Sequence, residues 1–259
     1  ATNESYRRIA IERGKMNPDK VHVVRSGPSL ERMQQLPPNP EWKHGRPYLV
    51  GYVGVMGQQE GIDHLLKAVR ILVFEQGRDD IHFCLVGGGT ELEDMKALSS
   101  RLGLDSHVTF PGRIPDQPML EILNTADMCV NPDIANAMND KSTMNKIMEY
   151  MALGKPIVQY DLTEGRFSAR EASLYARPND IKDLADKIAW LADHPEERER
   201  MGTFGHKRVT EELHWGVEAP KYLHVFDQLQ TDGSAQRGQT RPKRSLSRVS
   251  KALKNLFCP

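Results

Sequence analysis

Short apolar runs alternate with amphipathic segments of helical spacing along most of this 259-residue chain. Each run is followed by a turn and then by apolar residues recurring every three or four positions. This alternation predicts an α/β fold, with a doubly wound (Rossmann-like) parallel sheet and right-handed crossovers. The predicted strands comprise residues 48–55, 81–86, 107–110, 128–131, 157–158 and 174–176.

Four of the turns that follow these strands are expected to meet at one edge of the sheet. Parallel strands end at the same edge, and ligands bind there in open α/β sheets. The turns are residues 54–61, 87–90, 112–113 and 140–146. The glycine spacing does not match the dinucleotide fingerprint, so NAD is not predicted. The convergence predicts one small-molecule site, with Gly54, Gly57, Gly88 and Arg113 as candidate binding residues, although Arg113 could instead be a solvated surface arginine.

Residues 139–158 (NDKSTMNKIMEYMALGKPIV) are predicted to form a polar turn, a helix and a buried strand. Ser142 and Thr143 can cap the helix by accepting hydrogen bonds from its first N–H groups. The N–H groups and dipole at that end favour an anion such as a phosphate. Glu149 lies one turn further along, where its carboxylate could accept hydrogen bonds from sugar or ribose hydroxyls. The alternative is a core helix with Glu149 as a solvated acid.

The first turn of this helix carries Asn145 and Lys146. A cation is electrostatically unfavourable at a helix N-terminus, and a bound diphosphate would reverse that penalty. We therefore interpret Lys146 as a diphosphate contact, with a solvated surface lysine as the alternative. Asn145 could orient the diphosphate or simply complete the turn.

The run EYMALGKPIV, which begins at Glu149, resembles the donor-site signature of the family 4 glycosyltransferases, retaining enzymes of the GT-B architecture. The resemblance spans roughly residues 21–229. It implies the C-terminal, donor-binding half of such an enzyme, which moves a sugar from a nucleotide diphosphate sugar to a glycan or lipid-linked acceptor. Residues 1–27 would be the tail end of a missing N-terminal domain with the crossover, and residues 28–230 the Rossmann-like nucleotide-sugar-binding domain. By itself such a chain is expected to bind nucleotide weakly and to transfer little.

The resemblance places Glu149 at the second acid of the family's paired-glutamate motif, which is expected to contact the ribose. The first acid should lie eight positions earlier, where this chain has Lys141. Asp140 could substitute for it, or Lys141 could meet the diphosphate instead. The candidate catalytic residues are therefore Glu149, Asp140 and Lys141, and the candidate diphosphate contacts on this segment are Thr143, Asn145 and Lys146.

The turn after the first strand departs from the family pattern. The family commonly carries an Arg and a Lys that contact the donor diphosphate, and the matching positions here are Val55 and Glu60. Another cation could serve the diphosphate, backbone N–H groups could serve it, or the site could have lost its donor. Two other functions therefore stay open, a nucleotide-sugar epimerase-like GT-B enzyme and a non-catalytic nucleotide-binding or scaffold domain.

Composition and charge exclude several classes of protein. The 35 basic and 35 acidic side chains balance, so no nucleic-acid partner is indicated. Three scattered cysteines indicate a reducing, cytoplasmic setting rather than a disulfide framework or a zinc site. The nine histidines have no metal-ligand spacing, and neither a metal nor a cofactor is expected. No apolar run approaches the length of a membrane span. The chain begins with Ala, as expected of a fragment of a longer protein.

Both flanks of the core carry further expectations. A helix capped by Thr2 or Asn3, a short strand at residues 21–24 and a linker at 35–45 are predicted near the N-terminus. Residues 161–168 are predicted to be a polar loop, whose Glu164 and Arg166 could pair with each other or line the sugar pocket. Residues 231–259 contain seven Lys and Arg against a single acid, with apolar residues at helical spacing. They are predicted to be either a disordered tail or a basic amphipathic segment, in which 237–257 would contact an anionic membrane peripherally.

Overall fold

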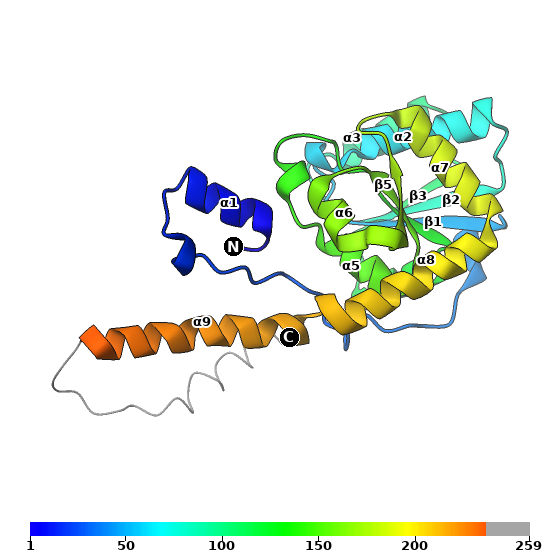
Figure 1. Ribbon diagram of the computed structural model, residues 1–259. Coiled ribbons are helices and arrows are strands. Elements are labelled where there is room, and N and C mark those ends of the chain that lie inside the picture. Colours follow the sequence, from blue (N-terminus) through cyan, green and yellow to red (C-terminus); the bar gives the residue numbers. More distant parts are fainter. Residues whose placement is uncertain (237–259) are drawn as a thin grey trace. The chain divides into compact units, whose positions relative to one another are not determined.

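The computed structural model describes residues 1–236 of the chain. The chain divides into two units, Ala1–Lys221 and a second unit that begins at Tyr222. The first unit is built on a six-stranded parallel sheet with the order β3-β2-β1-β4-β5-β6 (Figure 1). The strands are β1 (Tyr48–Val53), β2 (Ile81–Val86), β3 (Val108–Gly112), β4 (Met128–Asn131), β5 (Ile157–Tyr160) and β6 (Ser173–Ala176). The predicted fold class is confirmed. The order of the strands reverses direction between β1 and β4, which makes that pair the switch point of the sheet.

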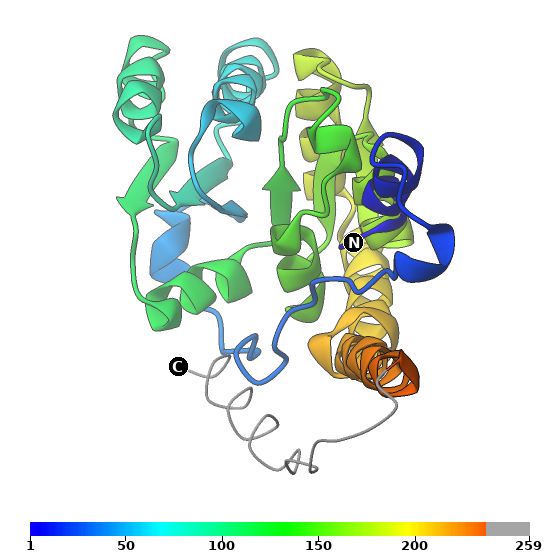
Figure 2. The same cartoon turned by 90° about the vertical axis from the view of Figure 1, so that its left-hand side faces the viewer.

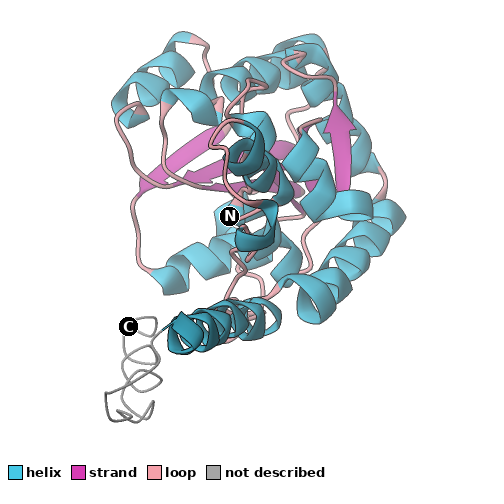
Figure 3. Cartoon of the chain, turned by 60° about the vertical axis from the view of Figure 1, so that its left-hand side comes forward, coloured by secondary structure: helices cyan, strands magenta, loops and turns pink. Residues whose placement is uncertain are grey.

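Helices cover both faces of this sheet (Figure 3). One face packs against α2 (Ile62–Arg70), α3 (Leu92–Arg101) and α7 (Ile181–Asp193). The opposite face packs against α4 (Asp116–Thr125) and α5 (Asn145–Ala152), and α8 (Pro195–Arg208) packs against α5. Neighbouring residues of β1 point to opposite faces, so Leu49 joins the α4–α5 core whereas Val50 joins the α2–α7 core. Burial on both faces explains why the strands are nearly continuous apolar runs.

Short 3₁₀-helical and π-helical turns connect these elements. The 3₁₀ turns are η1 (Pro18–Lys20), η2 (Pro40–Lys43), η3 (Gln58–Glu60), η5 (Asn139–Lys141) and η6 (Arg170–Ala172). Two π-helical turns, η4 (Ile71–Glu75) and η7 (Val209–Leu213), extend α2 and α8. None of the helices within residues 1–236 is long and apolar enough to cross a membrane.

The N-terminal helix α1 (Glu4–Glu12) lies beside the loop before α5 and beside α6 (Thr163–Ala169) (Figure 2). Asn3 caps α1, as predicted, by accepting a hydrogen bond from the Tyr6 N–H at 2.8 Å. The buried Asn3 amide also donates to the Lys141 carbonyl at 2.8 Å and to the Thr143 hydroxyl at 3.0 Å. Polar side chains therefore fix residues 1–12 to the segment that leads into α5.

Three local predictions were wrong. Residues 21–24 form no strand, because no strand among residues 1–236 pairs with them. Their backbone is bonded to Ala1 instead, which accepts from the Val24 N–H at 2.9 Å and donates its ammonium to the His22 carbonyl at 2.8 Å. The expected polar loop at 161–168 contains α6, whose first N–H, that of Thr163, donates to the Asp140 carboxylate at 2.8 Å. Ser142 and Thr143 do not cap α5, since the helix begins two residues after Thr143 and both hydroxyls bond elsewhere.

The chain enters and leaves the sheet domain at a single crossing point. Gly27 passes so close to the outgoing chain that a Cβ there would lie 2.3 Å from the Leu213 carbonyl oxygen. Next to it, the Trp215 N–H donates to the Pro28 carbonyl at 3.3 Å. The helix α9 (Trp215–Gln236) starts here and includes the first six residues of the expected basic tail, 231–236. The predicted membrane-contacting residues 237–257 lie outside the described residues, and the boundaries at 27 and 230 stay predictions.

Candidate functional site

The loops that follow β1, β2 and β3 are joined by backbone hydrogen bonds at the carboxyl edge of the sheet. Gly54 N–H donates to the Val86 carbonyl at 3.1 Å, and Met56 N–H donates to the Gly88 carbonyl at 2.9 Å. Gly57 immediately precedes η3 in the same loop, and Arg113 is exposed after β3, with its Cβ 3.8 Å from the Cβ position of Gly88. Three of the four predicted turns therefore meet as expected.

The loops after β1 and β4 pack together at the switch point. Gly61 has a positive φ of 66°, and a Cβ there would lie 2.1 Å from the Pro132 carbonyl oxygen. The Gln59 carbonyl accepts from the Ile134 N–H at 3.1 Å and from the Asn139 amide at 2.9 Å. The two loops thus have one fixed relative position, directly beside the start of α5.

Helix α5 begins at this point and presents its first N–H groups without a side-chain cap from residues 1–236. Asn145, its first residue, is exposed, whereas Lys146 is 9% exposed. The hydroxyl of Tyr150, one turn later, accepts from the Val53 N–H at 2.9 Å and so holds α5 to the end of β1. An uncapped helix N-terminus at the switch point is suited to an anionic group.

Lys146 joins the two loops through a buried cluster of charges, which we call the switch-point cluster (Glu60, Asp133 and Lys146). Its ammonium donates to Asp133 Oδ1 at 2.9 Å and forms a short ion pair with Glu60 Oε2. Glu60 also accepts from the Tyr52 hydroxyl at 3.0 Å, and the Lys146 nitrogen lies 5.0 Å from the centre of the Tyr52 ring. Glu60 comes from the β1 loop, Asp133 from the β4 loop and Lys146 from α5. The glutamate at the position where the resemblance implies a lysine therefore holds a lysine supplied by the helix.

The switch-point cluster is electrostatically unusual because it has two carboxylates and one cation. Asp133 is 1% exposed, and its second oxygen, Oδ2, has no hydrogen-bond partner within the described residues. Burial raises the pKa of Asp133 to about 7; Lys146 opposes this shift and Glu60 adds to it. Burial and the charge of Glu60 also raise the pKa of the Tyr52 hydroxyl. The cluster can therefore gain or lose a proton near neutral pH.

Glu149 lies on the same helix and is partly buried. Its Oε1 accepts from Arg32 at 3.4 Å, and Arg32 makes a two-pronged ion pair with Asp116 at 2.7 and 2.8 Å. Burial raises the pKa of Glu149, and the charge of Arg32 acts in the opposite direction. The carboxylate has accessible surface and can accept further hydrogen bonds.

Asp140, Lys141 and Thr143 have structural partners near the start of α5. Asp140 accepts from the first N–H of α6, and the Lys141 ammonium donates to the Ala137 carbonyl at 2.8 Å. Thr143 accepts from Asn3. Of the two alternatives for Glu164 and Arg166, the pairing with each other is not formed, since Glu164 binds Ser5 and Arg25, and Arg166 binds Asp161. Whether the first three residues also contact a donor stays a prediction.

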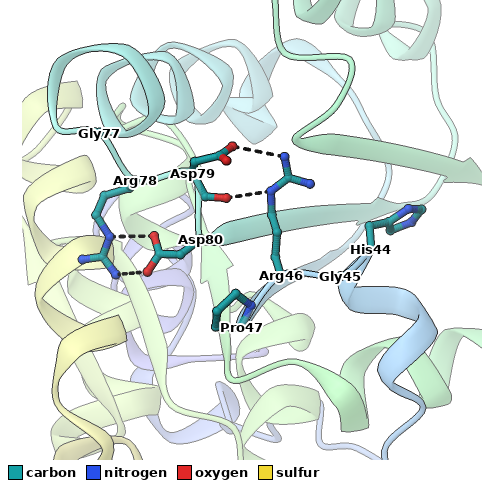
Figure 4. Close-up of a pocket in the computed structure, with 8 residues that line it drawn as sticks. All are labelled: His44, Gly45, Arg46, Pro47, Gly77, Arg78, Asp79 and Asp80. Atoms are coloured by element: carbon teal, nitrogen blue, oxygen red, sulfur yellow. Dashed lines mark hydrogen bonds and ion pairs between the residues drawn. The ribbon is translucent and has the colours of Figure 1, made fainter.

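A surface cavity of about 620 Å³ lies at the opposite, amino-terminal edge of the sheet (Figure 4). It is lined by His44, Gly45, Arg46, Pro47, Gly77, Arg78, Asp79 and Asp80. Figure 4 shows Arg46 directed at Asp79 and Arg78 at Asp80, and both pairs are hydrogen-bonded. Because parallel α/β sheets bind ligands at the carboxyl edge, we place the candidate site at the switch point and not in this cavity.

Sequence reasoning missed Arg32, Asp133 and Tyr150. Asp133 had a detectable signal, since it is an acid two residues after a predicted strand at the edge where sites form. Arg32 had none, because its partners Asp116 and Glu149 lie 84 and 117 residues away. Within residues 1–236, no group of three or more His, Cys, Asp or Glu side chains is arranged to hold a metal ion.

The doubly wound sheet places this domain in the large class of Rossmann-like α/β proteins. Comparisons with known proteins then identify its family. Over residues 47–194, more than half of the chain, the sequence matches the family described as Glycosyl transferases group 1. The chain belongs to this family.

Individual relatives are similar in sequence or in fold. Phosphatidyl-myo-inositol mannosyltransferase of Mycobacterium leprae is 28% identical over 158 residues, which are 60% of this chain and 40% of the relative. A glycosyltransferase from Rickettsia africae has a TM-score of 0.75 at 15% identity, over 89% of this chain and 62% of its own. Anabaena HepE, solved in complex with UDP-glucose, has a TM-score of 0.73 at 16% identity, over 89% and 63%. The fold is that of the C-terminal half of the GT-B architecture. The chain spans between 38% and 57% of the length of the curated relatives it matches.

Proposed function

We propose that this chain is the donor-binding domain of a retaining glycosyltransferase, which moves a sugar from a nucleotide diphosphate sugar to a glycan or lipid-linked acceptor. The observation that carries the proposal is the meeting of the β1 loop, the β4 loop and the uncapped start of α5 at the switch point, in a chain of the group 1 glycosyltransferase family. This is where an α/β sheet binds an anionic ligand.

Each part of the donor has a proposed partner. The N–H groups at the start of α5 would hold the diphosphate, with Lys146 adding positive charge and the glycine turns at Gly54 and Gly88 allowing close approach. Glu149 would accept hydrogen bonds from the ribose hydroxyls. The domain would then act by orienting the donor and stabilising the charge of the departing diphosphate. We expect the reaction to need no metal ion.

A lipid-linked acceptor is supported by the name of one relative. The Mycobacterium leprae relative is named for a phosphatidyl-inositol substrate, and a lipid-linked acceptor is compatible with peripheral membrane contact. We propose, for the whole protein, that a second domain binds the acceptor.

Calorimetric titration of the chain with UDP, GDP and ADP tests the donor site. We expect one nucleotide to bind, and Glu149→Ala to weaken it about tenfold or more, because a hydrogen bond to a charged group contributes about 1.5–3 kcal/mol. Glu93→Ala is the matched control, since Glu93 is 80% exposed on α3 and pairs with Lys96. This control should bind like the unmodified chain.

The same titration can refute the proposal. If none of the three nucleotides binds, the domain has no donor site of its own and the non-catalytic alternative gains support. If a nucleotide sugar binds and is converted without any acceptor, product analysis would identify an epimerase-like enzyme instead of a transferase.

A further inference from the structure

The switch-point cluster carries more negative than positive charge before any donor arrives. Glu60 and Asp133 each contribute one negative charge when ionised, and Lys146 contributes one positive charge. A nucleotide sugar brings two further negative charges on its diphosphate. A ligand of this kind placed beside Lys146 would be repelled by the net charge of the cluster unless one carboxylate becomes neutral.

The geometry identifies which carboxylate can become neutral. Glu60 is 15% exposed and its Oε2 accepts from both Lys146 and Tyr52, so its charge is well compensated. Asp133 is 1% exposed and bonds Lys146 through Oδ1 alone, while Oδ2 has no partner among residues 1–236. A buried carboxylate oxygen without a donor is costly when charged, and a proton on that oxygen removes the charge.

The surroundings of Asp133 contain few other groups that could respond. The charged and titratable groups of the described residues that act on it are Lys146 from α5 and Glu60 from η3, and the Tyr52 hydroxyl from β1 lies in the same cluster. The Tyr52 hydroxyl is neutral, because burial raises its pKa. Added negative charge near Lys146 would therefore act chiefly on Asp133.

We propose that Asp133 is a positioning residue that takes up one proton when the diphosphate of a nucleotide sugar binds beside Lys146. The proton comes from the solvent and adds to Asp133 Oδ2, which leaves a neutral cluster in which Glu60 alone balances Lys146. This inference rests on the proposed donor site. By linkage, the proton strengthens nucleotide-sugar binding by the same factor by which the nucleotide sugar strengthens protonation.

The consequence is a donor affinity that falls as pH rises. Asp133 has a pKa of about 7 in the free domain, and nearby diphosphate charge raises it further. Between the free and the bound pKa, one proton is taken up per ligand, and the affinity falls by up to about tenfold per pH unit. Nucleotide sugars are suitable probes because their diphosphate diesters keep a constant charge over this range.

The test is calorimetry of the chain with UDP-glucose and with GDP-mannose at pH 8, in HEPES and in Tris, which differ in ionisation enthalpy. We expect uptake of between half a proton and one proton per nucleotide sugar, and an affinity several-fold weaker at pH 8 than at pH 7. An affinity that does not change with pH, with no proton uptake, would overturn the inference and leave the donor site intact. If neither nucleotide sugar binds, the proposed function fails and this inference fails with it.

Two variants test whether Asp133 is the group that takes up the proton. Asp133→Asn should bind with no proton uptake and no pH dependence, whereas a merely structural role would weaken binding equally at every pH. Glu60→Gln serves as the second variant if Asp133→Asn does not fold. Without the charge of Glu60, Asp133 should bind its proton less tightly, so uptake at pH 8 should decrease and affinity at pH 8 should increase. Unchanged uptake in either variant contradicts the assignment to Asp133.

Discussion

The two edges of the sheet both carry clusters of charged side chains, but they pair those charges differently. At the amino-terminal edge, Arg78 binds Asp80 through two hydrogen bonds and Asp193 through a third, near the surface. At the carboxyl edge, two carboxylates share Lys146 in a buried position. The carboxylates of the first edge are partly exposed beside a cavity of about 620 Å³. At the second edge Asp133 is 1% exposed, and its Oδ2 has no hydrogen-bond partner among the described residues. The difference therefore lies in burial, which makes the charges of the carboxyl edge the more costly to leave without a partner.

The largest difference between the edges should appear on removing one cation from each. Lys146→Met leaves two buried carboxylates without their cation and should lower the free energy of unfolding by about 3–5 kcal/mol at pH 8. Arg78→Met removes ion pairs with two partly exposed carboxylates and should lower it by about 1 kcal/mol. Urea unfolding followed by circular dichroism measures both.

The cost of Lys146→Met should also shrink at pH 6, where Asp133 in the variant becomes protonated. Equal costs for the two variants at pH 8 would show that the two edges do not differ in the way described.

A smaller contrast should appear on replacing a left-handed glycine at each edge. Gly61→Ala places a Cβ 2.1 Å from the Pro132 carbonyl oxygen and should lower the free energy of unfolding by about 3 kcal/mol, through backbone strain and displacement of the β4 loop. Gly77→Ala, at the cavity of the amino-terminal edge, has a similar φ of 69° with open space around the new Cβ. It should cost about 1 kcal/mol, from backbone strain alone.

Thermal unfolding of the two glycine variants provides the comparison. Tolerance of alanine at position 61 would mean that the β1 and β4 loops can move apart, contrary to a fixed switch point.

The third contrast is a pair of opposite pH dependences. Asp133 has a folded pKa of about 7, above its ordinary value of 3.8, so the stability it contributes is present at low pH and is lost as pH rises through 7. His82, buried at the other edge, has its pKa lowered to about 3, chiefly by burial, and its contribution is present above pH 6.5 and is lost as pH falls towards 3. Each contributes a slope of up to about 1.4 kcal/mol per pH unit.

Unfolding free energies measured from pH 4 to pH 8 for Asp133→Asn and His82→Gln would separate these contributions. Asp133 makes the free energy of unfolding decrease as pH rises, and Asp133→Asn should abolish this decrease. His82 makes the free energy of unfolding increase as pH rises, and His82→Gln should abolish this increase. Parallel curves for either variant and the unmodified chain would contradict the assigned pKa.

Sequence reasoning predicted the sheet well because local signals define it. The strands Ile81–Val86 and Met128–Asn131 have the predicted boundaries, since continuous apolar runs between turns are typical of strands that are buried on both faces. The pattern failed at residues 21–24, where an extended apolar run has no neighbouring strand. Strand formation requires a partner that local sequence does not show.

The candidate site was only partly predictable, for the same physical reason. Its location followed from the turns after the strands, and Lys146 was identified from its place at a helix N-terminus. Glu60, the ion-pair partner of Lys146, was noticed only because it differs from the family pattern. Its pairing with Lys146 could not be predicted, because the two residues are 86 positions apart. The pairing of Glu149 with Arg32 depends in the same way on how the chain folds back.

The crossing at Gly27 has a consequence for the engineering of this fold. Because the incoming chain at Pro28 and the outgoing chain at Trp215 touch, the intervening sheet domain begins and ends at one place. A protein whose ends adjoin can be circularly permuted, with a short peptide joining the old termini and new termini opened in a surface turn. The domain between these two residues could therefore be inserted into a loop of another protein. Because its two ends adjoin, the two sides of that loop would stay close together.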